Sequence, residues 1–316
     1  MDGQRQTAGT GVDGTGTGGT DARGTGSGET DARGTDVSRT GARGLRPAIA
    51  LVRASHPEPT AMVTALAMAL AIGTGRSGIG VLAVGAAVLA GQLSVGWHND
   101  WLDAARDAAA GRPDKPVAAG AISRRTVGRS ALTALIAAVP LSLASGWRPA
   151  LAHLVAIALA WAYNTRLKAT VISFVPYAVS FPLLVAFVTL GAPHASWPPW
   201  WALVTAALLG CSAHLVNVVP DMADDLAAGV RGLPHRLGRS RSVSATVALL
   251  MAATVVESFG PGHPGWWAGI AVVAVAAAIT AGIVLGRKPG SRWLFRAVLV
   301  AAAIDVAGLV ARGSRL

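Results

Sequence analysis

The sequence contains one cysteine, Cys211, in 316 residues. A single thiol excludes an intrachain disulfide framework and leaves no cysteine pair for a metal site. Charged residues are also scarce, since they make up 14% of the chain, whereas about 25% is usual in soluble domains. Hydrophobic residues make up 52%. This balance indicates a membrane protein and argues against a secreted disulfide scaffold or a soluble Rossmann domain.

Acidic residues are outnumbered, with 16 Asp and Glu against 27 Lys and Arg. In a soluble protein such an excess of basic charge would indicate nucleic-acid binding. Here the basic residues lie between long apolar runs instead of forming one block. We therefore interpret them as determinants of membrane topology and expect no nucleic-acid partner.

The first 44 residues differ from the rest of the chain. They contain no Leu, Ile, Phe, Trp or Tyr, and Gly and Thr fill half of the segment. Such a composition buries too little apolar surface to offset the loss of chain entropy, so residues 1–44 are predicted to form a disordered cytoplasmic tail. The segment has no apolar core of a secretory signal. A solvated tail, a start codon assigned too far upstream and a partner-binding arm all stay open as its explanation.

Residues 45–316 form the second predicted domain, which is dominated by apolar stretches close to the roughly 20 residues that a membrane-spanning helix needs. These stretches are rich in Ala, Val and Leu and show little alternation of apolar and polar residues, which favours helices over a β-barrel. We predict an all-α, polytopic membrane protein with about nine transmembrane helices. The predicted spans cover residues 57–75, 78–97, 127–146, 149–165, 170–190, 199–219, 242–259, 265–285 and 293–311.

The distribution of basic residues predicts how this domain is oriented. With the N-terminus in the cytoplasm, the cytoplasmic side holds all of the Lys and Arg residues except Arg76, Arg148, Arg312 and Arg315. This asymmetry follows the positive-inside rule. We expect a multi-pass protein of the cell membrane with its N-terminus in the cytoplasm and its C-terminus on the opposite side.

Most of the acidic residues beyond residue 58 fall in two short windows at predicted cytoplasmic helix ends. The windows Asn99–Asp107 and Asn217–Asp225 both contain the pattern Asn-x3-Asp-x3-Asp. On a helix this spacing places one amide and two carboxylates above one another on the same face. Because like charges one turn apart repel each other, each column requires a cation between its members. A solvated loop outside the membrane is the alternative, and two copies in register argue against it.

Oxygen ligands without His or Cys favour Mg²⁺, which binds through a few carboxylates together with substrate phosphates and water. We therefore predict that the two columns hold Mg²⁺ ions and one diphosphate, with Asn99 and Asn217 in contact with the substrate. The predicted catalytic residues, of which all but the first are predicted metal ligands, are Asp100, Asp103, Asp107, Asp221 and Asp225.

Basic and aromatic residues near the windows suit an anionic substrate. Lys115 and Arg231 each follow an acidic window behind Pro or Gly turns and are predicted diphosphate contacts. Tyr163 and Lys168, between the fourth and fifth stretches, are further candidates for substrate binding. Arg53 is a candidate partner for a carboxylate on an aromatic acceptor. Each basic residue alone is also explained as a topology determinant or membrane anchor.

At these residues the chain resembles the UbiA superfamily of intramembrane prenyltransferases. Two family hallmarks are an Asn-Asp-x2-Asp-x3-Asp motif after the second membrane helix and an Asp-x3-Asp motif after the sixth, matched here by Asn99–Asp107 and Asp221–Asp225. Gly232 is a departure, because relatives commonly carry Thr there. Other segments that resemble the family lie at Leu51–Pro57, Lys115–Gly120, Tyr163–Lys168 and Gly229–Pro234.

The resemblance implies a helical bundle around a central cavity, with capping loops on the cytoplasmic side. It also implies Mg²⁺-dependent transfer of an isoprenyl group from an allylic isoprenyl diphosphate to a lipophilic or aromatic acceptor. The physical logic agrees, because cations stabilise the leaving diphosphate and an apolar cavity keeps water from the carbocation. Candidate aromatic side chains for contact with that carbocation are Trp97, Trp101, Trp161 and Tyr163.

Two other functions are alternatives to prenyl transfer. A terpene cyclase on the same scaffold would use the same motifs and quench the cation within its own substrate. An ion-coupled transporter would bind cations with intramembrane carboxylates, but it predicts acidic residues near the midpoints of broken helices. Here the acidic windows lie at helix ends, which favours the enzyme.

Overall fold

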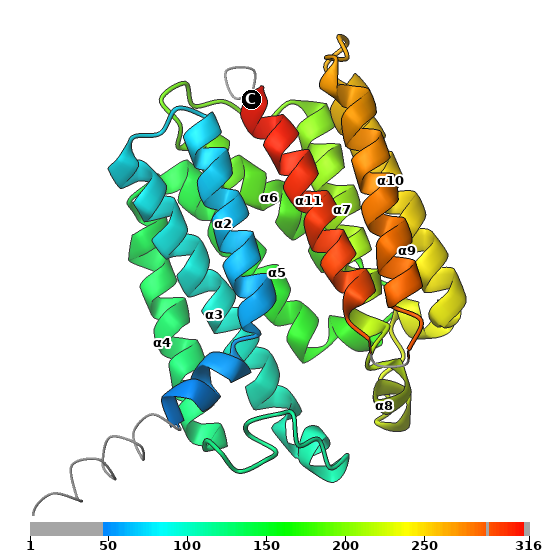
Figure 1. Ribbon diagram of the computed structural model, residues 1–316. Coiled ribbons are helices and arrows are strands. Elements are labelled where there is room, and N and C mark those ends of the chain that lie inside the picture. Colours follow the sequence, from blue (N-terminus) through cyan, green and yellow to red (C-terminus); the bar gives the residue numbers. More distant parts are fainter. Residues whose placement is uncertain (1–46, 289–290, 313–316) are drawn as a thin grey trace, which may run out of the picture. The chain divides into compact units, whose positions relative to one another are not determined.

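The computed structural model describes residues 47–288 and 291–312, and every regular element within them is helical (Figure 1). The all-α prediction is therefore confirmed, while the predicted tail at residues 1–44 lies outside the described residues. A short helical stretch over residues 47–54 comes first. The other elements are α2 (Pro57–Gly73), α3 (Gly78–Ala109), α4 (Arg124–Leu143), α5 (Trp147–Thr165), η1 (Leu167–Ala169), α6 (Val175–Leu190), α7 (Trp200–Val218), α8 (Met222–Ala227), α9 (Leu233–Phe259), α10 (Trp267–Leu285) and α11 (Trp293–Ala311).

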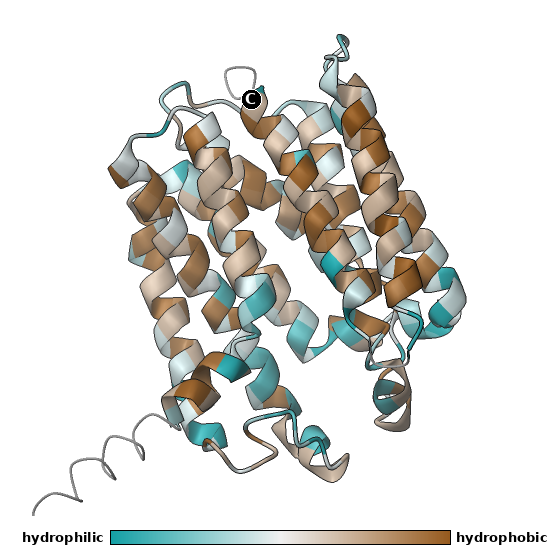
Figure 2. Cartoon of the chain, viewed as in Figure 1, coloured by the Kyte–Doolittle hydropathy of each residue, from teal (hydrophilic) through white to brown (hydrophobic). Residues whose placement is uncertain are grey.

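The helices have the length and surface of membrane spans. Six of those described, α3, α4, α7, α9, α10 and α11, are long and apolar enough to cross a bilayer, and α2 and α6 are shorter apolar helices. Large apolar side chains such as Leu82 and Val273 are 65% and 69% exposed, and apolar residues cover much of the bundle in Figure 2. Such a surface requires lipid around it. The chain is a multi-pass membrane protein, and the number of nine spans stays a prediction.

Two helices extend well beyond the predicted spans, and of these two extensions only that of α3 carries acidic residues. α3 continues from residue 97 to Ala109, and its buried positions there include Asp100, Asp103 and Asp107. α9 starts at Leu233 instead of residue 242 and bends at Gly238, where φ is 77°. The added turns of both helices are polar, so a hydropathy criterion does not extend the predicted spans to them.

A close backbone contact fixes the position of α3 against the start of the chain. Gly96 lies so near residues 47–55 that a Cβ atom there would come within 2.5 Å of the Ser55 carbonyl oxygen. Trp97, the next residue, donates a hydrogen bond from Nε1 to the Leu51 carbonyl at 2.8 Å. These contacts hold His56 beside the acidic end of α3, because His56 follows directly after the packed segment.

Gly96→Ala is therefore expected to destabilise the fold. The methyl group forces two backbone segments apart, and overpacking of this kind costs about 1–3 kcal/mol. Gly269→Ala is the matched control, since a Cβ at this position in α10 meets no atom within 4 Å. Thermal melting of the detergent-solubilised protein should show a lower Tm for Gly96→Ala only. An unchanged Tm would show that the contact does not fix α3.

The opposite end of the bundle holds a buried ion pair that is remote from the acidic windows. Glu257 and Arg312 lie 2.8 Å apart between Oε1 and Nη1, and the Arg312 guanidinium also lies 4.3 Å from the centre of the Trp267 ring. Glu257, which lies outside both acidic windows, is thus paired in the structure. The pair ties the ends of α9 and α11 together and takes no part in the site described next.

Candidate active site

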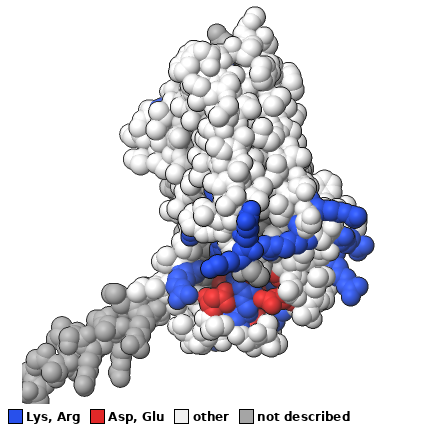
Figure 3. Space-filling model, turned by 45° about the vertical axis from the view of Figure 1, so that its right-hand side comes forward, with Lys and Arg blue, Asp and Glu red and all other residues white. Residues whose placement is uncertain are grey.

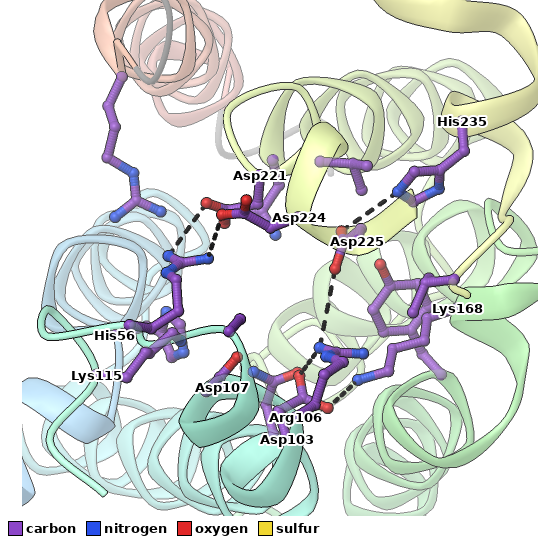
Figure 4. Close-up of a pocket in the computed structure, with 18 residues that line it drawn as sticks. His56, Asp103, Arg106, Asp107, Lys115, Lys168, Asp221, Asp224, Asp225 and His235 are labelled. Atoms are coloured by element: carbon purple, nitrogen blue, oxygen red, sulfur yellow. Dashed lines mark hydrogen bonds and ion pairs between the residues drawn. The ribbon is translucent and has the colours of Figure 1, made fainter. Parts of the chain in front are cut away.

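The acidic windows meet in one pocket at a single end of the bundle (Figure 4). Figure 3 shows acidic side chains gathered there and surrounded by basic ones. The pocket draws on the ends of α3, α5, α7 and α9, together with η1, α8 and the residues before α2 and α11. Its lining consists of His56, Asn99, Asp103, Arg106, Asp107, Ala110, Arg112, Lys115, Tyr163, Lys168, Asn217, Val218, Asp221, Asp224, Asp225, Val230, His235 and Arg292.

The first window forms the column that its spacing predicts. Asn99, Asp103 and Asp107 follow one another at helical spacing on continuous α3, and all three line the pocket. Asp100 is different, because it is 2% exposed and is not among the lining residues. Its Oδ1 lies 2.9 Å from Lys115 Nζ and 3.1 Å from His56 Nε2. Asp100 therefore positions the side chains of Lys115 and His56 at the pocket wall.

The second window lines the pocket too, but the expectation of one continuous helical column there is wrong. Asn217 lies in the last turn of α7, which ends at Val218, whereas Asp225 belongs to the separate helix α8. Pro220 stands between them and cannot continue the hydrogen-bonding pattern of α7. The break places Asp221 just before α8, so the chain presents Asp221, Asp224 and Asp225 from a turn and a short helix.

Arginine side chains connect the two windows across the pocket. Arg106 Nη2 lies 2.7 Å from Asp103 Oδ2 and 3.8 Å from Asp225 Oδ1, so one guanidinium reaches a carboxylate of each window. Lys168 Nζ contacts the other oxygen of Asp103 at 2.5 Å. Figure 4 shows these contacts along one side of the pocket, between Asp103 and Asp225. The two groups of carboxylates therefore face each other within the span of one side chain.

A second arginine, Arg112, bridges the loop after α3 to the other window. Its Nη2 lies 3.2 Å from Asp221 Oδ1, and its Nη1 lies 3.4 Å from Asp224 Oδ2. Arg112 also pairs with Asp114 at 2.9 Å. This hydrogen bond raises the pKa of the Arg112 guanidinium and lowers the pKa of the Asp114 carboxyl. Both groups stay charged at neutral pH, and the loop after α3 is held against the second window.

The donor set fits a hard divalent cation that is shared with a substrate. Five aspartates and two asparagines line the pocket, and oxygen ligands of this kind suit Mg²⁺. Among the described residues, no three His, Cys, Asp or Glu side chains are grouped closely enough to hold a metal ion by themselves. Mg²⁺ commonly binds through one or two carboxylates, phosphates and water, so an open arrangement fits it.

Not every residue singled out by the sequence reaches the pocket. Tyr163 and Lys168 line it, as do Lys115 and the two asparagines. Arg53 and Arg231 do not: Arg53 Nη2 donates to the Asp114 carbonyl at 3.4 Å, and Arg231 offers its own carbonyl to Arg236. The polar lining residues that sequence reasoning missed are His56, Arg106, Arg112, Asp224, His235 and Arg292.

Of the four aromatic candidates, Tyr163 alone lines the pocket. Trp97 is bound to the Leu51 carbonyl. Trp161 stacks on His98 at 3.7 Å between ring centres and donates to Ser94 Oγ at 3.2 Å. Trp101 lies under the Arg124 guanidinium at 5.2 Å. The three tryptophans pack between elements, and only the tyrosine presents an aromatic side chain to the acidic centre.

A comparison of sequences identifies the family of the chain. The profile of the UbiA prenyltransferase family matches residues 60–302, which include both acidic windows. The chain belongs to the UbiA prenyltransferase family. It is thus a membrane-embedded enzyme, a prenyltransferase. The digeranylgeranylglyceryl phosphate synthase of Methanoregula boonei is similar, with 31% identity over 229 residues, which cover 69% of this chain and 80% of that protein.

Solved structures of UbiA homologues share the fold. The apo UbiA homologue of Aeropyrum pernix has a TM-score of 0.66 at 18% identity, over 81% of this chain and 98% of that one. A UbiA homologue of Archaeoglobus fulgidus, bound to GPP and Mg²⁺, has a TM-score of 0.61 at 16% identity, over 84% of this chain and 99% of that one. These similarities confirm the UbiA-type helical fold predicted from the two acidic windows.

Proposed function

We propose that this UbiA prenyltransferase transfers an isoprenyl group from an allylic isoprenyl diphosphate to a lipophilic or aromatic acceptor, with Mg²⁺ as cofactor. The observation that carries the proposal is the reach of Arg106 from Asp103 to Asp225. The two carboxylate groups are near enough for one diphosphate and its counter-ions to touch both. The GPP and Mg²⁺ found in the Archaeoglobus fulgidus homologue support the same pairing of ligands.

The carboxylates that would hold the metal are Asp103, Asp107, Asp221 and Asp225, all of which line the pocket. When bound, Mg²⁺ supplies positive charge that stabilises the departing diphosphate. Lys115 and Lys168 add cationic groups at the pocket wall, where Asp100 and Asp103 hold them at 2.9 and 2.5 Å. We therefore assign both lysines to the diphosphate oxygens, with Asp100 as the group that positions Lys115.

The rest of the reaction depends on the acceptor side of the pocket. The bond between C1 and the diphosphate oxygen breaks, its electron pair leaves with the diphosphate, and C1 bonds to the acceptor, which releases a proton. Tyr163 is placed to face the positive charge that develops on the isoprenyl carbon, since it lines the pocket beside the carboxylates. The acceptor must reach this point from the apolar interior or from the membrane surface.

The experiment that tests the proposal measures whether an acceptor is required. Purified protein is incubated with Mg²⁺ and labelled geranylgeranyl diphosphate, with and without a panel of lipophilic and aromatic acceptors. The proposal predicts label in a prenylated acceptor and little turnover of the diphosphate alone. A cyclic hydrocarbon formed without any acceptor would contradict it and identify a terpene cyclase on the same fold.

We also propose that the pocket opens to the cytoplasm, with the N-terminus on that side and the C-terminus on the other side of the cell membrane. The cluster of basic residues around the pocket end supports this orientation (Figure 3). A cysteine introduced in the loop after α3 should react with a membrane-impermeant thiol reagent only in inverted vesicles. Reaction in intact cells would contradict the orientation.

Lys115→Ala is expected to reduce kcat/KM for the diphosphate by about 10- to 100-fold, the range for one hydrogen bond to a charged group. Lys288→Ala is the control, because Lys288 is exposed and does not line the pocket. Steady-state kinetics with varied diphosphate measure the difference. Lys115→Arg should recover part of the loss, since it keeps a cation beside Asp100. Equal effects of Lys115→Ala and Lys288→Ala would leave Lys115 as a topology determinant only.

A further inference from the structure

One basic side chain in the pocket differs from the others in its partners. The pocket is lined by five Lys or Arg residues, and four of them, Arg106, Arg112, Lys115 and Lys168, are bound to aspartates. The fifth, Arg292, forms no ion pair with any residue that the structure describes. Its guanidinium lies 5.7 Å from the centre of the Phe295 ring, which is a contact with an uncharged group. Arg292 thus brings a positive charge to the pocket without a carboxylate to balance it.

The pairing of the other four basic side chains sets Arg292 apart from them. Lys115 pairs with Asp100, which does not line the pocket, and Arg112 pairs with Asp114 as well as with Asp221 of the second window. Arg106, Arg112 and the lysines lie among the aspartates that would hold the diphosphate, whereas Arg292 does not. The charge of Arg292 is therefore available to a second anion.

The guanidinium group of Arg292 favours particular kinds of anion. A guanidinium presents parallel N–H donors that fit the two oxygens of a carboxylate or phosphate. Arg292 lies directly before the membrane helix α11, so an anion bound to it has an apolar helix beside it. This arrangement suits a molecule with a charged headgroup and a lipophilic body. The sequence indicated Arg53 as the partner for a carboxylate on the acceptor. In the structure, however, Arg53 contacts the Asp114 backbone and does not line the pocket.

We propose that Arg292 binds an oxyanion, a phosphate or a carboxylate, that is carried by the acceptor. The acceptor headgroup then lies on the α11 side of the pocket, while the isoprenyl diphosphate occupies the aspartates of α3, of α8 and of the turn before α8. Arg292 is a specificity-determining residue that makes the enzyme select anionic acceptors over neutral ones. This inference rests on the proposed function, because it needs the diphosphate site to be filled first.

The test uses binding, with the first site filled by an unreactive donor. Full-length protein in detergent is saturated with Mg²⁺ and geranyl S-thiolodiphosphate, and acceptor analogues are titrated by isothermal calorimetry. The probes are two matched pairs, an alkylglyceryl phosphate with its alkylglycerol, and 4-hydroxybenzoate with 4-hydroxybenzamide. The variants are Arg292→Ala, Arg292→Lys and the control Arg287→Ala, in which the lost arginine is exposed in the same connection but does not line the pocket.

We expect the wild type and Arg287→Ala to bind the anionic member of at least one pair about 10- to 100-fold more tightly than the neutral member. The pair that shows the preference distinguishes phosphate from carboxylate. Arg292→Ala should lose the preference and Arg292→Lys should keep part of it, with unchanged binding of the thiolodiphosphate in both.

Other outcomes overturn the inference. Wild-type protein without a preference in either pair, or a preference that survives in Arg292→Ala, would contradict it. A loss of thiolodiphosphate affinity in Arg292→Ala, with acceptor preference intact, would assign Arg292 to the donor instead. Failure of the wild type to bind thiolodiphosphate with Mg²⁺ is a different result, because it would contradict the proposed function itself.

Discussion

Asp103→Ala is expected to abolish prenyl transfer while the protein still inserts into the membrane. Asp103 lies at the centre of the pocket, with Lys168 at 2.5 Å on one oxygen and Arg106 at 2.7 Å on the other. Its loss removes a proposed metal ligand, leaves Lys168 without its carboxylate, and breaks the link that Arg106 makes toward Asp225. Loss of one group that stabilises a transition-state charge costs about 10²- to 10³-fold in kcat, and this variant loses several such effects together.

The measurement compares kcat and membrane yield for Asp103→Ala and a matched acidic variant. Glu58→Ala serves as the control, because Glu58 is an acid at the start of α2 that pairs with Arg296 outside the pocket. Asp221 lies on the opposite wall of the pocket, and Asp221→Ala should lose as much activity as Asp103→Ala. Activity near the wild-type level in either aspartate variant, with Glu58→Ala equally active, would remove the aspartates from the mechanism.

Chelation of divalent cations is the second change expected to abolish turnover. The carboxylates lie on opposite walls, and no three acidic or imidazole groups within the described residues form a closed cage. Because an open site of this kind holds Mg²⁺ weakly without the diphosphate, EDTA should remove the ion readily, and added Mg²⁺ should restore the rate. Turnover that persists in excess chelator would show that the reaction needs no metal.

The same experiment distinguishes a catalytic ion from a structural one. Arg106 and Arg112 pair with the carboxylates of both windows (Figure 4). The aspartates are then not left unpaired against one another, so EDTA should change the Tm by little. A structural metal would behave differently, since its removal unfolds the site. We therefore expect chelation to abolish activity and to leave thermal melting nearly unchanged.

Local spacing was sufficient to predict the first acidic window. Asn99, Asp103 and Asp107 recur at four-residue intervals, and α3 continues through all of them as one helix. The second window has the same spacing, yet it is broken after α7. Pro220 marks that break in the sequence, because proline has no backbone N–H to donate and kinks or breaks a helix. Spacing alone predicts a column only where no helix-breaking residue interrupts it.

Contacts between distant segments explain what the sequence could not show. Arg112 reaches Asp221, which is 109 residues away in the chain, and His56 reaches Asp100 across 44 residues. No local pattern identifies such partners. Basic residues are common at the cytoplasmic ends of membrane helices for topological reasons. Sequence reasoning therefore singled out Arg53 and missed Arg292, and only the packing of the helices brings Arg292 into the pocket.

The most direct test of the central claim is to locate the metal itself. Crystals grown with Mn²⁺ and geranyl S-thiolodiphosphate would be measured at the manganese absorption edge. Anomalous peaks are expected between the two windows, about 2.1 Å from carboxylate oxygens of Asp103 or Asp107 and of Asp221 or Asp225, with the thiolodiphosphate bridging them. Peaks confined to one window, or a thiolodiphosphate bound away from both, would contradict the account.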